Sequence, residues 1–130
     1  MHKLYAVIAV IMGGLGVALG AFGAHGLQKL TADPLIIHSY QTGVEYQQFQ
    51  AVAILGVSLI YPYCNAVLTR WAARLMITGT ILFSGSLYLI TLLKINESSG
   101  VKIAGPITPL GGLLMIAGWF LLVPAILKKK

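Results

Sequence analysis

Long apolar runs alternate with short polar connections along the whole sequence. Three of the runs carry no charge, and each is long enough to cross a bilayer as a helix. A further run is strongly apolar from Phe49 onward and ends at Pro62, which cannot continue a helix. The pattern predicts an all-α integral membrane protein, a four-helix bundle forming a single transmembrane domain over residues 1–130. The predicted spans are residues 4–24, 44–62, 75–93 and 108–127.

Local signals predict where the helices start. Asp33 followed by Pro34 is typical of an N-cap and a first helical position, although residues 35–46 are mixed in polarity. The second span is therefore either one long helix or an interfacial helical segment that bends into the membrane. Thr108 followed by Pro109 predicts the start of the fourth helix in the same way. The polar residues 95–105 between the third and fourth runs are expected to form a loop.

The first run has an alternative interpretation. It follows His2 and Lys3, and its small residues at 18–24 resemble a signal-peptidase site. We favour an uncleaved span because the apolar segment of a secretory signal is usually shorter than this run.

The composition excludes an ordinary soluble globule. Of the 130 residues, 58% are hydrophobic and only 9% are charged, whereas soluble domains carry about 25% charged residues. Disorder is also disfavoured, because disordered chains have low hydrophobicity. The single cysteine, Cys64, permits no intrachain disulfide and no cysteine-based zinc site.

The basic residues mark the ends of the apolar runs and predict the orientation. The formal net charge is +6, but the charges are not clustered with aromatic residues as in a nucleic-acid-binding surface, so no nucleic acid is expected. Four spans place both termini on one side. The basic residues on that side are Lys3, Arg70, Arg74, Lys128, Lys129 and Lys130; those on the other are Lys29, Lys94 and Lys102. The positive-inside rule predicts cytoplasmic termini, and the basic residues predict contact with anionic lipid. We expect a multi-pass protein of the bacterial cytoplasmic (inner) membrane.

Glycines recur at helical spacing and predict close helix packing. Gly13, Gly16, Gly20 and Gly23 fall on one face of the first span, and Gly111 and Gly112 lie near the start of the fourth. Small residues let membrane helices approach closely, within a chain or in a homo-oligomer. The alternative is a smooth path for a small solute.

A few polar residues remain as candidates for chemistry. Glu45 is the one acidic residue near a membrane segment, about 16 Å along a helix that starts at Pro34. A carboxylate inside the membrane is a functional candidate, so its depth is decisive. We expect a polar site toward the outer side of the membrane. Its candidate residues are His25, Glu45, Gln47, Gln50, Ser84 and Ser86.

The sequence contains no known catalytic or cofactor motif. It lacks a nucleophile elbow, zinc spacing, P-loop and dinucleotide fingerprint. We therefore expect no enzymatic activity, no catalytic residues, no metal and no cofactor.

Three motifs resemble one known family. Residues 20–27 read GAFGAHGL, residues 83–88 read FSGSLY and residues 107–112 read ITPLGG. Together they resemble the small membrane proteins of domain of unknown function family 423, which are related to animal transmembrane protein 256. The resemblance implies a four-helix membrane protein, uncleaved at its first span, and no known activity. Members usually have His where this chain has Gln50, so a role that needs a protonatable group is in doubt while a hydrogen-bonding role is not.

We therefore expect a non-enzymatic structural or interaction protein of the membrane. The alternative is an oligomeric transporter or channel for a small solute, a proton or another cation, with Glu45 as the coupling group. Lipid binding or assembly with a partner is a third possibility.

Overall fold

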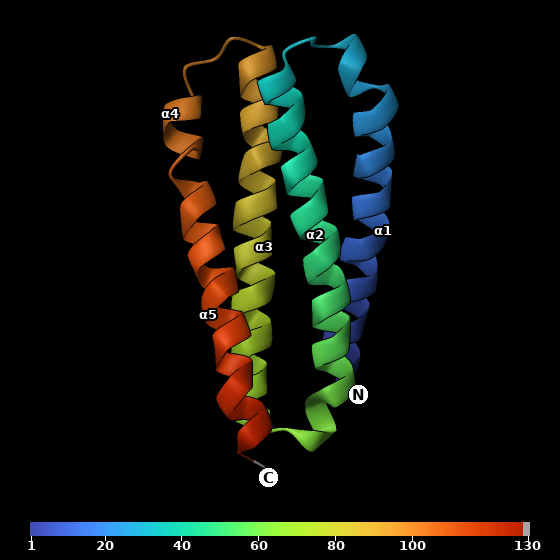
Figure 1. Ribbon diagram of the computed structural model, residues 1–130, viewed down its shortest axis with the longest axis vertical. Helices are drawn as coiled ribbons and strands as arrows, with labels where there is room; N and C mark the ends of the chain where they lie inside the picture. Colours follow the sequence, from blue (N-terminus) through green and yellow to red (C-terminus); the bar gives the residue numbers. More distant parts are fainter. Residues whose placement is uncertain (129–130) are drawn as a thin grey trace.

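The computed structural model describes residues 1–128 and consists of four long antiparallel helices joined by short connections (Figure 1). The part described contains no strand, as expected from the sequence. The long helices are α1 (Lys3–His25), α2 (Pro34–Ile60), α3 (Ala66–Ile95) and α5 (Ile107–Leu127). The short elements are η1 (Leu27–Lys29), η2 (Tyr61–Tyr63) and α4 (Val101–Ala104).

The start of α2 follows the predicted capping signal. The Asp33 carboxylate accepts a hydrogen bond from the Leu35 amide at 2.9 Å, and Pro34 occupies the first helical position. This confirms the predicted start. The helix then continues without interruption to Ile60, so the predicted second span lies on one long helix rather than on two segments.

The other two starts differ from the sequence expectations. The third helix begins at Ala66, well before residue 75, because Asn65 caps it by accepting a hydrogen bond from the Leu68 amide at 3.1 Å. The prediction that Thr108 caps the fourth helix is wrong, since α5 starts at Ile107 after Pro106. Residues 95–105, expected to be a loop, include the helical turn α4.

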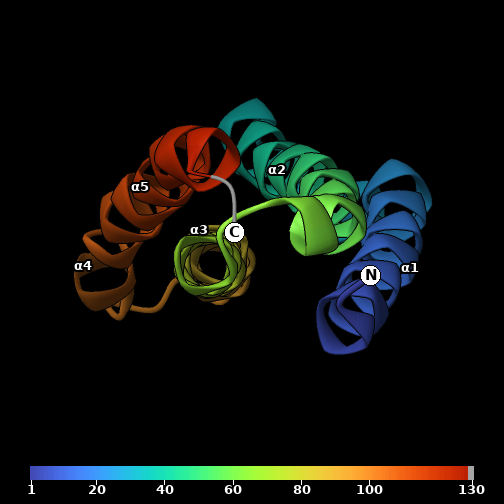
Figure 2. The ribbon, with the colours of Figure 1, turned by 90° about the horizontal axis from the view of Figure 1, so that it is seen from below.

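The long helices pack in chain order rather than as a closed square. α1 packs on α2, α2 on α3 and α3 on α5. Seen along the helices in Figure 2, α1 and α5 lie at opposite ends of a curved row, with α3 in the bend between α2 and α5. The row leaves open grooves between helices that are not direct neighbours.

Buried side chains hold the row together at both ends. Near the termini, one apolar cluster draws on all four long helices, through residues such as Tyr5, Ile54, Met76 and Leu122. At the other end, a smaller cluster is formed by Leu27, Tyr40 and Val44.

The glycine face of α1 lies against α2. A Cβ on Gly16 would lie 2.8 Å from the Gln48 side chain, and a Cβ on Gly23 would lie 2.6 Å from the Tyr40 ring. At Gly20 the corresponding distance to Val44 is 3.3 Å, and at Gly13 the distance to Ala51 is 3.8 Å. Gly16 and Gly23 leave no room for a side chain, so α1 and α2 approach closely at these two positions.

Glycines also bring α3 and α5 together. A Cβ on Gly111 would overlap the backbone nitrogen of Phe83, and one on Gly79 would lie 2.7 Å from the Gly111 carbonyl oxygen. Gly112 is less constrained, because a Cβ there would be in ordinary contact with Phe83 at 3.7 Å. The close approach of α5 to α3 therefore requires a glycine at position 111.

Three stretches are long and apolar enough to cross a membrane: Lys3–Lys29, Ala66–Ile95 and Val101–Leu127. Helix α2 has sufficient length, with 27 residues. It is less apolar because glutamines and Glu45 occupy its middle. The first residues of α1 and the last residues of α5 lie at the same end of the bundle (Figure 1).

Replacing Gly111 by alanine should destabilise the fold. The added methyl group meets backbone atoms that cannot move independently, so we expect G111A to lower the unfolding free energy by about 1–3 kcal/mol. Thermal unfolding of the purified protein in detergent measures the effect. G85A is the matched control, since a Cβ at Gly85 has nothing within 4 Å. Equal stability of the two variants would contradict this description of the α3–α5 contact.

Candidate functional site

The polar residues in the middle of α2 point in different directions. Gln47 and Gln50 are buried, at 7% and 2% exposure, whereas Glu45 is exposed. Because successive helical residues are rotated by about 100°, this short stretch faces three different surroundings.

Gln47 connects three helices. Its Nε2 donates to the Met12 carbonyl oxygen of α1 at 2.8 Å, and its Oε1 accepts from the Tyr88 hydroxyl of α3 at 2.7 Å. Both ends of the amide are used, so Gln47 acts as an interhelical hydrogen-bonding group.

Ser84 and Ser86 also bond inside the bundle. The Ser84 hydroxyl donates to the Gly43 carbonyl oxygen of α2 at 2.7 Å. The Ser86 hydroxyl donates to the Phe83 carbonyl oxygen at 2.8 Å and lies 2.5 Å from the Thr108 hydroxyl of α5. Thr108, the second residue of α5, therefore bonds across to α3 and does not cap its own helix.

Sequence reasoning missed Tyr40 and Gly43. The Tyr40 hydroxyl donates to the Leu19 carbonyl oxygen at 2.5 Å, and its ring fills the space beside Gly23. Gly43 lets α3 approach, since a Cβ there would lie 3.0 Å from the Tyr88 ring. A glycine among large residues in the middle of α2 was the available signal for a close approach.

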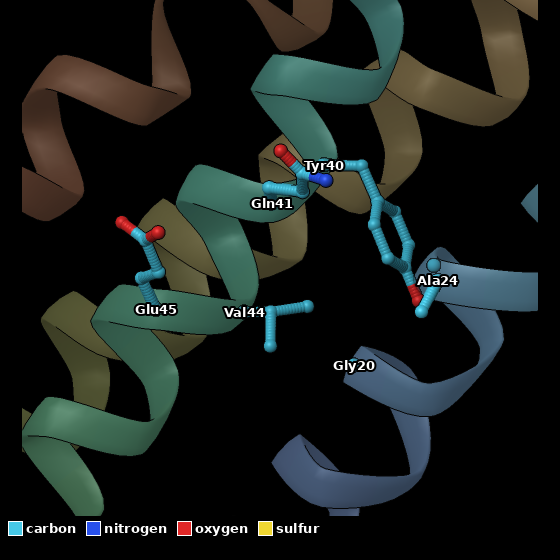
Figure 3. Close-up of a pocket in the computed structure, with 7 residues that line it drawn as sticks. Gly20, Ala24, Tyr40, Gln41, Val44 and Glu45 are labelled. Atoms are coloured by element: carbon cyan, nitrogen blue, oxygen red, sulfur yellow. The ribbon is translucent and has the colours of Figure 1, made fainter.

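Glu45 points away from the bundle. Figure 3 shows its carboxylate directed away from α1, and no hydrogen bond or ion pair reaches it within residues 1–128. It borders an open hollow of about 360 Å³ between α1 and α2, together with Gly20, Tyr40 and Gln41. Val44 lies beside Gly20, which is five residues before His25 at the end of α1. Glu45 therefore lies about 9 Å further along the bundle axis toward the middle of the bundle than His25 does.

Gln50 faces a different groove, between α2 and α5. Its Oε1 is buried without a hydrogen-bond partner in the part of the chain that the structure describes. His25 is exposed at the end of α1. The structure therefore does not bring the six candidate residues together: Gln47, Ser84 and Ser86 are bonded internally, while His25, Glu45 and Gln50 lie in three separate places.

Gln47, Ser84 and Ser86 take part in hydrogen bonds between the helices. Within residues 1–128, no three His, Cys, Asp or Glu side chains gather as a metal site would require. Cys64 is buried. Of the six candidate residues, His25, Glu45 and Gln50 make no side-chain hydrogen bond within residues 1–128, and among these three only Gln50 has a buried polar atom without a partner.

The bond between Gln47 and Tyr88 should contribute measurably to stability. We expect Q47L and Y88F each to lower the unfolding free energy by about 1 kcal/mol. A double-mutant cycle should give a coupling near the ~0.6 kcal/mol typical of hydrogen bonds between membrane helices. Y63F is the control, because Tyr63 is 79% exposed. Strict additivity of Q47L and Y88F in chemical unfolding would contradict the bond.

Comparison with known proteins identifies relatives over nearly the whole chain. A protein family described as "Protein of unknown function (DUF423)" matches residues 19–112. A UPF0382 membrane protein of Schizosaccharomyces pombe is 44% identical over 112 residues, covering 86% of this chain and 92% of that protein. The UPF0382 inner membrane protein YgdD of Escherichia coli K12 is 38% identical, covering 95% and 89%.

A UPF0382 membrane protein of Staphylococcus aureus is 36% identical over 126 residues, covering 97% of both chains. No solved structure matches. Relatives in bacteria and in a yeast are thus named as membrane proteins, in agreement with the apolar helices of this chain. The chain belongs to the DUF423 family of membrane proteins of unknown function.

Proposed function

We propose that this protein is a non-enzymatic assembly protein of the bacterial cytoplasmic membrane, and that it binds a second copy of itself through the outward face of α2. The observation that carries the proposal is the position of Glu45. It lies within the apolar length of the bundle, faces outward and has no partner in residues 1–128.

A carboxylate in this position is costly if it faces lipid. Polar and ionisable groups inside a membrane normally face other protein groups or water. Glu45 is accompanied one helical turn away by exposed Gln41, and His38 extends the same stripe toward the start of α2. We refer to His38, Gln41 and Glu45 as the α2 polar stripe. A protein partner would replace lipid along this stripe.

A second copy of the chain offers groups that can form hydrogen bonds with the α2 polar stripe. Parallel packing of two α2 helices would place Glu45 about 6 Å along the helix axis from Gln41 of the other copy, a separation that the two side chains can span, and an amide nitrogen can donate to a carboxylate. Below the stripe, exposed Phe49 and Val52 would extend the contact with apolar packing.

Transport through one chain receives less support. The hydroxyls and the amide that might line a path, those of Ser84, Ser86 and Gln47, already bond to other groups of the bundle. Glu45 borders open hollows, so a path between copies of an oligomer would place it as the coupling group. Such a transporter would require the assembly proposed here.

Removing the carboxylate should weaken assembly. Contacts of this kind between membrane helices contribute about 0.6–2 kcal/mol, so we expect E45L to raise the dissociation constant about three- to thirtyfold, with a smaller effect for E45Q. The measurement is dissociation in lipid bilayers by dilution of fluorescently labelled protein. E97Q, an acid-to-amide change in the loop after α3, is the control. A wild-type chain that remains monomeric would contradict the proposal, as would an E45L variant that associates as strongly as the wild type.

We further propose that both termini are cytoplasmic. Lys3, Arg70 and Arg74 lie at the end of the bundle that holds the termini, while Lys94 and Lys102 lie at the other. In a Cys64→Ser background, an impermeant thiol reagent added to intact cells should label a cysteine introduced at Ser99. It should not label one added after the last residue. The reverse labelling pattern would place the termini outside the cell and would contradict the proposed orientation.

A further inference from the structure

We propose that the groove between α2 and α5 binds a bilayer-soluble ring compound that carries a hydroxyl group, the chemical class of phenols and quinols. The groove is about 350 Å³ in volume, within the usual range of small-molecule sites. This inference does not depend on self-association. The side chains that matter most in the groove are Tyr46, Phe49, Gln50, Phe83, Met115 and Trp119.

The groove exists because α2 and α5 both pack on α3, which lies in the bend of the row (Figure 2). Aromatic rings line it from all three helices. Tyr46 and Phe83 have ring centroids 4.7 Å apart, and Phe49 stacks on Trp119 at 5.8 Å. Ring faces and edges of this kind favour another aromatic ring over a flexible acyl chain.

Gln50 supplies the specific polar contact. The side chain is only 2% exposed, and its Oε1 is buried without a partner in the described residues. Gln47, one turn earlier, has both ends of its amide bonded. Leaving a buried amide oxygen unsatisfied is costly, and more so in an apolar medium. Gln50 also lines the groove, so a rotation of its amide would present this unpaired acceptor to a bound hydroxyl group.

The depth of Gln50 in the bilayer indicates which class of ligand can reach it. Its neighbour Ala51 packs opposite Gly13, near the middle of the apolar run of α1. Phospholipid headgroups lie at the membrane surface, and acyl chains have no hydrogen-bond donor at this depth. A phenol or quinol dissolved in the bilayer brings both a ring for the aromatic walls and an O–H donor for Gln50 Oε1.

Trp119 provides a direct reporter of binding. The chain has two tryptophans, so W71F leaves only the one that lines the groove. The probe is 3-bromo-5-octylphenol, whose bromine quenches indole fluorescence on contact, with its methyl ether as the matched compound without a donor. We expect saturable quenching by the phenol in lipid nanodiscs that hold one chain each, and about five- to tenfold weaker apparent affinity for the ether.

Two further variants separate the hydrogen bond from the shape of the groove. In the W71F background, Q50L should weaken phenol binding about five- to tenfold, while Q48L, the same change on the side of α2 that faces Gly16, should not. I116F should also weaken binding by filling the groove, and Ile116 is 54% exposed, so folding should tolerate the change. Quenching that rises linearly with probe concentration, equal affinity for phenol and ether, or unchanged affinity in both Q50L and I116F would each overturn the proposal.

Discussion

Polar side chains that are shielded from water need hydrogen-bond partners within the protein, and this need determines what the residues of α2 contact. In an apolar medium a side-chain amide or hydroxyl must find a partner within the protein. Gln47 meets this need by bonding to α1 and α3 at once, and Ser84 by bonding to the backbone of α2. These bonds require close helices, which Gly16 and Gly43 permit by leaving no side chain in the way. Packing and polar bonding therefore depend on each other.

The curved row of helices leaves two polar groups of α2 without a partner in the described residues. In a closed square bundle α1 would also pack on α5, whereas here α1 packs mainly on α2 and α5 mainly on α3. In the row, α2 has one side turned away from both of its neighbours, and a groove separates it from α5. Glu45 occupies the open side and Gln50 the groove. The open arrangement thus leaves these two groups available to partners outside the chain.

Much of the architecture could be predicted from local sequence signals. The four helices follow from apolar runs, and the start of α2 follows from Asp33 and Pro34, because caps act within a few residues. The pairing of Thr108 with Ser86 could not be predicted, since it depends on how α3 and α5 are rotated against each other. The same limit applies to the candidate site. Spacing places Glu45 and Gln50 on one helix but does not show that one faces outward and the other a groove.

The central claim is that the α2 polar stripe lies between copies of the chain. The most direct measurement places a spin label at Val52, which is 73% exposed and two turns beyond Glu45 on the same face, in a Cys64→Ser background with Glu45 intact. Pulsed electron paramagnetic resonance in lipid bilayers should give a defined distance between copies, shorter than that from a label at Val10 on the outer face of α1. No dipolar signal between copies, or a shorter distance from Val10, would contradict the account.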